Sequence, residues 1–423
     1  MGRTTNKLKT PPVKPVQKIE LKDKNNKGRL ALVILLIIIG ISALGYGLFG
    51  LLSTEKGWRE IKANNTKEMN CSSEFVFMYN IGASETSPTV ENKALTNFYS
   101  DATVNAYKIF TSDEGFDEID NIYTMNQRPN VELEVDKALY EAFEVLQKYE
   151  NRYIYLAPVY AQYDDIFYST DESEIISYDP YSNEDVADYY AEIAAYANDS
   201  ESIDIKLLGE NKVMLYVSDE YLQYAKENGI NRFVDLFWMK NAFVTDYLAD
   251  AISEKGYTLG IISSKDGFSR NLAQNDSEYA YKIYDSIDGL VCQAAVVSGR
   301  GQQSRVYLRN FIMNEYDRPY YYALKNGEVR TSYLDIKDGF CKSAVNSLVS
   351  YSENKSCAEV LLSIMPLYIT EELNEQAIID LSSEDVYSIY CKDSVIYYND
   401  SNVVISDLYN YDNVNYTASL MKQ

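Results

Sequence analysis

Residues 235–246 read DLFWMKNAFVTD, and they open the most regular unit of the chain. Over residues 240–255 the apolar side chains recur at helical spacing, and Gly256 follows immediately. Glycine often ends a helix because it adopts the left-handed conformation found there without steric cost. Residues 257–263 then form an apolar run of the kind found in strands. The stretch therefore predicts an amphipathic helix that returns directly into a sheet.

Elements of both kinds are predicted on either side of this unit. Helical spacing and capping residues predict helices at 113–125, 136–149, 183–197, 218–228 and 358–365. Alternating or β-branched runs predict strands at 103–110, 203–208, 212–217, 279–284, 290–297, 305–308, 320–324 and 343–351, an extended segment at 153–160 and a hairpin at 386–398. This order of elements predicts an α+β (mixed α/β) body with mixed sheets.

The N-terminal segment has a different composition. Residues 30–52, LALVILLIIIGISALGYGLFGLL, carry no charge and are long enough to cross a hydrocarbon core of about 30 Å. Residues 1–29 contain nine Lys or Arg and two acidic residues, and positively charged flanks stay in the cytoplasm. We expect a basic cytoplasmic tail at 1–29, one transmembrane helix at 30–52 and a polar stalk at 53–75. The alternative for the apolar run is a cleaved signal peptide.

The remainder of the chain is strongly acidic. The formal net charge is −24, and subtracting the +7 of residues 1–29 leaves −31 for the rest. Such a surface repels the anionic backbone of nucleic acids. We therefore expect a single-pass protein of the cell membrane with a cytoplasmic N-terminus, an extracytoplasmic C-terminal domain and an extracytoplasmic protein partner.

Two residue types limit the possible chemistry. The chain contains no histidine, which excludes Ser-His and Cys-His catalysis as well as His-ligated metals. Its five cysteines are widely spaced and include no Cys-x-x-Cys pair. This pattern is not that of a disulfide scaffold, although it leaves a single bridge open.

The opening stretch resembles the signature of the ApbE family, the FAD:protein FMN transferases, which runs DLGGIAKGYAVD. Asp235 and Asp246 match this signature, as does the spacing between them. Ser298 and Gly299 stand where the family has a Ser-Gly after a strand, and residues 358–364, AEVLLSI, resemble its Ala-Asp-x-x-x-Thr helix start. The resemblance covers residues 76–398, leaves 399–423 as a C-terminal tail and implies a two-lobed ApbE-like body.

Members of this family bind FAD and a divalent cation, usually magnesium, and transfer FMN from FAD to a hydroxyl group of a target protein. The resemblance implies candidate cofactor-binding residues, which are Asp235, Asp246, Ser298 and Gly299. It also implies two candidate metal ligands, Glu359 and Ser363, whose oxygen atoms suit a hard cation.

The chain departs from the signature at several of its functional positions. Phe237 and Trp238 replace the paired glycines, and we expect these rings to lie in the core and to fill space that a pyrophosphate needs. Asn241 replaces the signature lysine, and the family's His-x-x-Asp-Pro segment is absent. The later Gly-Gly-Asp turn reads SKD at 264–266.

These departures favour a non-catalytic relative that acts through ligand or partner binding, with no catalytic residue assigned. An active, divergent, magnesium-dependent flavin transferase and a cell-envelope interaction protein with no flavin role are the alternatives. Residues 82–87, GASETS, also resemble the acceptor motif Ser-Gly-Ala-Thr-x-Thr-Ser that such transferases modify. This similarity leaves open whether Ser84 is a flavin acceptor.

Overall fold

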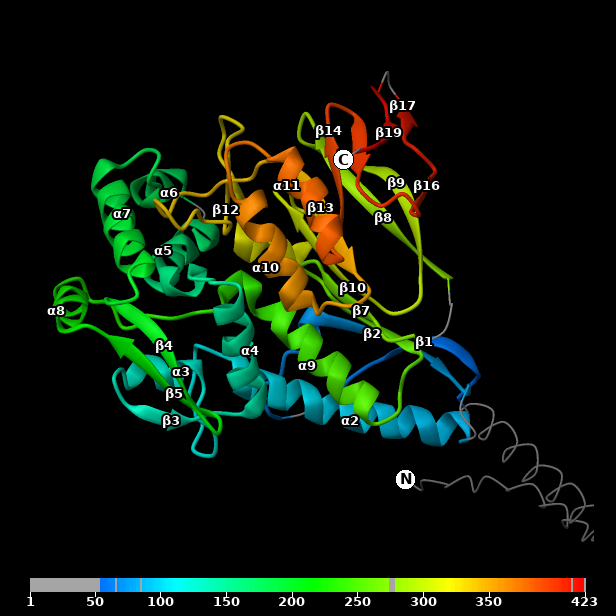
Figure 1. Ribbon diagram of the computed structural model, residues 1–423, viewed down its shortest axis with the longest axis horizontal. Helices are drawn as coiled ribbons and strands as arrows, with labels where there is room; N and C mark the ends of the chain where they lie inside the picture. The colour runs from blue at the N-terminus through cyan, green and yellow to red at the C-terminus, as the bar shows by residue number, and fades with distance from the viewer. Residues whose placement is uncertain are drawn as a thin grey trace, which may run out of the picture. The chain divides into compact units, whose positions relative to one another are not determined.

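The computed structural model describes residues 54–64, 67–83, 86–169, 171–273, 278–411 and 414–421. The predicted cytoplasmic tail, the predicted transmembrane helix at 30–52 and Ser84 lie outside these residues. Within the described part, no helix combines the length and the apolar character needed to cross a bilayer. The chain divides into two units, and the second, Glu55–Gln423, is the compact body shown in Figure 1.

This body is built on one nine-stranded sheet with the order β1-β2-β6-β7-β10-β13-β14-β15-β19. The strands are β1 (Gly57–Ile61), β2 (Phe75–Ile81), β6 (Gly260–Ser264), β7 (Phe268–Asn271), β10 (Gln303–Arg309), β13 (Ser347–Ser352), β14 (Tyr387–Lys392), β15 (Val395–Tyr398) and β19 (Thr417–Leu420). Neighbouring strands are antiparallel except β15 and β19, which pair in parallel.

Three helices pack on one face of this main sheet: α2 (Pro88–Phe110), α9 (Lys240–Glu254) and α10 (Cys357–Tyr368) (Figure 1). Helix α9 is the helix predicted from residues 240–255, and it ends as expected before Gly256, which has a φ of 84°. Its buried face includes Leu248 and Ile252, which join the larger of two hydrophobic cores.

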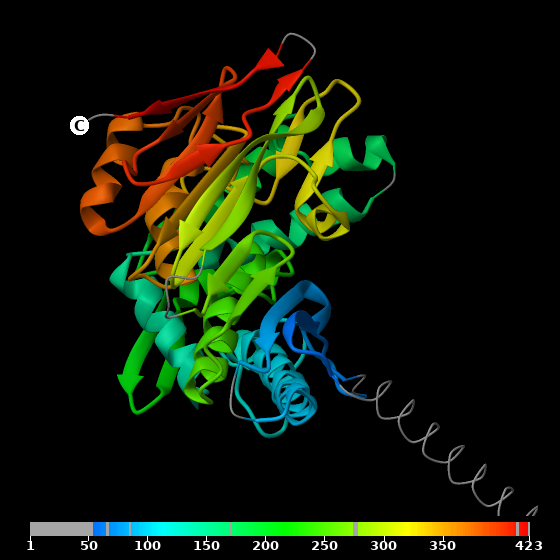
Figure 2. The same ribbon diagram turned by 90° about the vertical axis from the view of Figure 1, so that its right-hand side faces the viewer.

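The opposite face of the main sheet carries a second layer. It is a three-stranded sheet with the order β16-β9-β8, formed by β8 (Glu278–Ile287), β9 (Leu290–Arg300) and β16 (Val404–Ser406). Because side chains alternate along a strand, Leu348 of β13 enters the larger core while Val349 enters the smaller core under this second layer. Figure 2 shows the long β8–β9 hairpin beside the C-terminal strands.

A third group of elements lies along the side of the body away from the C-terminal strands (Figure 1). It contains the sheet β3-β5-β4, with β3 (Glu132–Glu134), β4 (Ile203–Gly209) and β5 (Lys212–Val217). Its helices are α3 (Ile122–Gln127), α4 (Lys137–Lys148), α5 (Ala157–Tyr168), α6 (Glu172–Tyr178), α7 (Glu184–Asn198) and α8 (Asp219–Glu227). The predicted hairpin at 203–217 and the predicted helix at 183–197 are confirmed.

Three local predictions were wrong. The helix predicted at 113–125 is the shorter α3, which begins only at Ile122 because Asn121 caps it. Residues 103–110 form the last turns of α2 and not a strand, because Ser87 caps a helix that buries Leu95, Tyr99 and Phe110 at helical spacing. Residues 153–160 are not extended, since they form a 3-10 turn, η2 (Tyr153–Leu156), that leads into α5.

The predicted stalk and C-terminal tail also differ from the structure. Residues 57–61, assigned to the stalk, form β1, which pairs with β2 and buries Ile61. Residues 404–406 and 417–420, assigned to the tail, form β16 and β19. Both segments are short and polar on one side, so their sheet pairing, and not their composition, fixes their structure.

Candidate functional site

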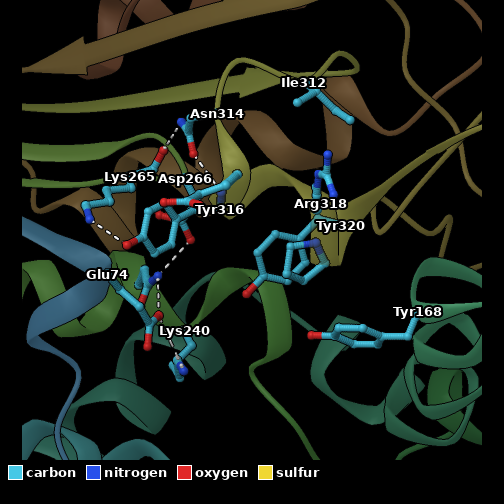
Figure 3. A pocket seen from close by; sticks show the side chains of 13 residues that line it. Glu74, Tyr168, Lys240, Lys265, Asp266, Ile312, Asn314, Tyr316, Arg318 and Tyr320 are labelled. Carbon is cyan, nitrogen blue, oxygen red and sulfur yellow. Dashed lines mark hydrogen bonds and ion pairs between the residues drawn. The ribbon is translucent and has the colours of Figure 1, made fainter.

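A cleft of about 950 Å³ opens beside the N-terminus of α9 (Figure 3). Glu74 precedes β2, and Lys240 and Asn241 begin α9. The turn between β6 and β7 contributes Lys265 and Asp266. The outer wall comes from α5, which contributes Tyr168, and from the segment around the 3-10 helix η4 (Glu315–Tyr320). The lining residues of that segment are Ile312, Asn314, Glu315, Tyr316, Arg318, Pro319 and Tyr320.

Asn241 joins two of the three carboxylates of this cleft, Glu74 and Asp266 but not Glu315. Its Nδ2 donates to Glu74 Oε2 at 3.0 Å and to Asp266 Oδ2 at 2.8 Å. The second carboxylate oxygen of Asp266 and the Asn241 Oδ1 are buried without a hydrogen-bond partner. Burial raises the pKa of Asp266 to about 6, although the neighbouring polar side chains of Ser264 and Asn241 act to lower it. Lys240 Nζ lies 3.7 Å from Glu74 Oε2, so these two side chains form an ion pair without net charge.

The β6–β7 turn is held rigidly from behind. Arg309 donates to the carbonyl oxygens of Asp266 at 3.1 Å and Lys265 at 3.3 Å, and it also pairs with Asp317. Gly267 in this turn has a φ of 127°, and a Cβ there would lie 2.4 Å from the Tyr307 carbonyl oxygen. A glycine is therefore required at position 267.

The two residues that replace the signature glycines are packed among tyrosines. Phe237 has a φ of 43°, in the left-handed region that glycine adopts freely. Its ring stacks on Tyr160 at 4.8 Å and meets Tyr320 edge-on at 5.6 Å. Trp238 is 4% exposed and packs edge-on against Tyr333 at 4.8 Å. The backbone thus keeps a glycine-like conformation while large rings occupy the adjoining space, and Trp238 lies in the core as predicted.

Asp235 and Asp246, two of the predicted cofactor-binding residues, both have their oxygens engaged within the protein. Asp235 accepts hydrogen bonds from Ser112 Oγ at 2.9 Å, Arg232 Nη1 at 2.8 Å and the Phe237 amide at 2.8 Å. Asp246 accepts from the amides of residues 357 and 358, both at 2.8 Å, and so caps α10. Burial raises the pKa of Asp246 to about 6 despite these bonds. Neither residue lines the cleft.

Ser298 and Gly299 lie in the second layer. Ser298 is an exposed residue of β9 that pairs with Val404 and Ala280, and Gly299 lies against the ring of Tyr279. The structure therefore does not bring these two residues together with Asp235 or with the cleft. They stay predictions that rest on the family resemblance.

The candidate metal ligands lie on the first turns of α10. Glu359 Oε1 pairs with Lys148 Nζ at 2.6 Å, and Oε2 accepts from the Ser356 amide at 3.2 Å in a capping box. Ser363 Oγ donates to the Glu359 carbonyl oxygen at 2.9 Å. Among the described residues, no group of three or more acidic or cysteine side chains could hold a metal ion. Because an ammonium group already neutralises Glu359, this arrangement does not fit a divalent cation.

The comparisons with known proteins identify the fold. No protein-family model and no curated protein matches the sequence. The ApbE protein from Thermotoga maritima has a TM-score of 0.51 and 11% identity, with 79% of this chain and 94% of that chain covered. The flavin transferase ApbE from Vibrio cholerae has a TM-score of 0.52 and 11% identity, with 80% and 95% covered. The protein is a mixed α+β protein. More specifically, it has a divergent ApbE-like fold, as residues 235–246 predicted.

Sequence reasoning missed most of the cleft itself. Glu74 lies 167 residues from its partner Asn241, and no local pattern marks it. The helix η4 in the cleft wall could have been predicted from the sequence, because Asn314 and Asp317 have the spacing of a capping box.

Proposed function

We propose that this chain is a membrane-anchored, extracytoplasmic relative of the ApbE flavin transferases that does not transfer flavin and acts by binding a ligand in its cleft. The observation that carries the proposal is the packing of Phe237 and Trp238 against Tyr160, Tyr320 and Tyr333. In the family signature these two positions are glycines, and glycine permits the close approach of a pyrophosphate to the backbone.

The charges around the cleft support the absence of transfer chemistry. Phosphoryl-type transfer needs cations that stabilise the negative charge developing on the transferred group. The signature lysine is Asn241, whose amide is bonded to two carboxylates. The candidate metal ligand Glu359 is paired with Lys148. Neither position presents a free positive charge to a phosphate.

The cleft itself supports ligand binding. Its volume of about 950 Å³ lies within the range of small-molecule sites, which is roughly 300–1,000 Å³. Its wall combines the rings of Tyr168, Tyr316 and Tyr320 with the cations Lys265 and Arg318 (Figure 3). Aromatic rings next to cations suit a planar ligand that carries an acidic group.

A transfer assay tests the non-catalytic part of the proposal. The full chain in detergent micelles is incubated with FAD, magnesium and a peptide that contains the Ser-Gly-Ala-Thr-x-Thr-Ser motif, beside an active ApbE enzyme. We expect a fluorescent, mass-shifted peptide only with the active enzyme. Covalent flavin on the peptide with this chain would instead establish the alternative, a divergent transferase.

The anchor is tested separately. The proposal rests here on the uncharged run at 30–52 and the basic residues before it. We expect the full chain to stay in the membrane pellet after alkaline carbonate extraction, and protease added from the extracytoplasmic side to digest the C-terminal domain. Recovery of the intact chain in the carbonate supernatant would contradict the anchor.

A further inference from the structure

We infer that a second pocket, of about 180 Å³ between β8 and β10, binds a phosphate-sized oxyanion through Arg305. This anion pocket shares Lys265 and Asn314 with the cleft, so the β6–β7 turn forms a wall of both. It lies on the sheet face that carries the second layer, away from α9 and α10.

The lining of the anion pocket is cationic, although the chain has a net charge of −24. Four of its lining residues are Lys265, Lys282, Arg305 and Arg309, and none of the described residues that line it is acidic. Serine and tyrosine hydroxyls make up much of the remaining polar surface. A cavity lined by several cations and by no acidic residue attracts anions.

Arg305 is the residue that most requires a partner. Arg270, Arg309 and Arg330 each pair with at least one carboxylate, whereas no ion pair or side-chain hydrogen bond of Arg305 is found among the described residues. Its guanidinium lies over the ring of Tyr281, 4.1 Å from the ring centre. Burial lowers the pKa of Arg305, in keeping with a cation that lacks a counter-ion. A bound anion would supply that charge.

The position of Arg305 on its strand aims it at the second layer. Arg305, Tyr307 and Arg309 alternate along β10, so they lie on one face of the sheet. The Tyr307 hydroxyl fixes the distance between β10 and β8, because it accepts from the Tyr284 amide at 3.1 Å and donates to the Tyr284 carbonyl oxygen at 3.0 Å. The Tyr281 hydroxyl, also on β8, is buried without a partner and is available as a donor.

Size and charge restrict the ligand. The pocket is about one fifth the volume of the cleft, so it suits a small tetrahedral oxyanion. Arg309 is already paired with Asp317, and Lys265 with the Tyr316 hydroxyl. Arg305 remains without an ion-pair partner among the described residues. Lys282 does not face this ligand, because it alternates with Tyr281 and Ile283 and is exposed on the other face of β8. The planar guanidinium can bind two phosphate oxygens at once.

Isothermal titration of the full chain in a maltoside detergent tests the inference, with inorganic phosphate as the first probe. We expect saturable binding that Arg305→Gln weakens by roughly tenfold or more, the loss typical of a charged hydrogen bond. Lys282→Gln should leave binding nearly unchanged, because this exposed side chain lies on the face of β8 opposite Tyr281. Arg300→Gln is the matched control, since Arg300 pairs with Glu278 on β8 and does not line the pocket.

Glycerol 3-phosphate, as a second probe, distinguishes the free phosphate ion from the phosphate group of a monoester. Equal binding of both probes points to a phosphomonoester, whereas binding of inorganic phosphate alone points to the free ion. The inference is overturned if the wild-type chain does not bind phosphate, or if Arg305→Gln binds it as tightly as Arg300→Gln. Thermal unfolding of each variant establishes that it is folded under the conditions of the titration.

Discussion

The left-handed backbone at Phe237 leads to an unusual order of stability among substitutions. In ordinary helical positions alanine is more stable than glycine by roughly 0.5–1 kcal/mol. At a φ of 43° a Cβ is unfavourable by roughly 1–2 kcal/mol, and only glycine avoids that cost. Phe237→Gly should therefore be more stable than Phe237→Ala, by about 1 kcal/mol.

Both variants should be less stable than the wild type. Truncating a fully buried phenylalanine costs roughly 3–5 kcal/mol, and Phe237 is only partly buried, so about 2 kcal/mol is expected from the lost contacts with Tyr160 and Tyr320. For Phe237→Gly, relief of the backbone strain offsets part of this loss. The predicted order of stability is wild type, then Phe237→Gly, then Phe237→Ala.

Equilibrium unfolding in guanidinium chloride, followed by far-ultraviolet circular dichroism, measures this order. Tyr160→Phe is a suitable control, because it keeps the stacked ring and leaves the backbone at residue 237 unchanged. The reasoning is refuted if Phe237→Ala unfolds at the same or a higher denaturant concentration than Phe237→Gly. Such a result would mean that the glycine-like backbone of the signature is no longer imposed by the fold.

Three further predictions concern the packing of charges and thiols. Arg330→Met should destabilise the protein by roughly 3–5 kcal/mol, because it leaves the fully buried Asp179 carboxylate without its two 2.9 Å bonds. Adding Asp179→Leu should recover most of that loss in the same unfolding assay. All five cysteines are free and only Cys292 is not buried, so one thiol should react with Ellman's reagent in the native protein and five after unfolding. The pKa of Asp266 is raised to about 6 in the fold from 3.8, so folding favours its protonated form, and stability should fall as pH rises from 4 to 6. Asp266→Asn should lessen that fall in denaturant titrations at each pH. An unchanged pH profile in this variant would contradict the assigned burial.

Short-range patterns predicted the elements that they determine directly. The helix at 240–254, its glycine stop and the strand after it depend on neighbouring residues, and the resemblance at 235–246 led to the correct fold. The hairpin at 203–217 was predicted for the same reason. By contrast, TVNAYKIF at 103–110 alternates like a strand, yet the long helix that begins at Pro88 determines its structure.

The candidate site was less predictable because its contacts span long stretches of chain. Asp235 and Asp246 were found by their match to the signature, but the sequence did not indicate that Ser112 and the α10 amides engage them. Likewise, Glu359 suggested a metal ligand until its partner Lys148, 211 residues earlier, was located. Long-range polar pairs of this kind leave no periodic signal in the sequence.

The pairing of β2 with β6 has a consequence for how the protein is made. Phe77 pairs with Ile262, so β2 leaves the ribosome long before its neighbour exists. At translation rates of about 5–20 residues per second, the delay is roughly 10–40 s. During that time the alternating apolar strand FVFMYNI has an open edge, which is a template for aggregation. Production of the protein in a cell-free system should thus depend on a holdase chaperone until residue 264 has been translated, and become independent of it afterwards.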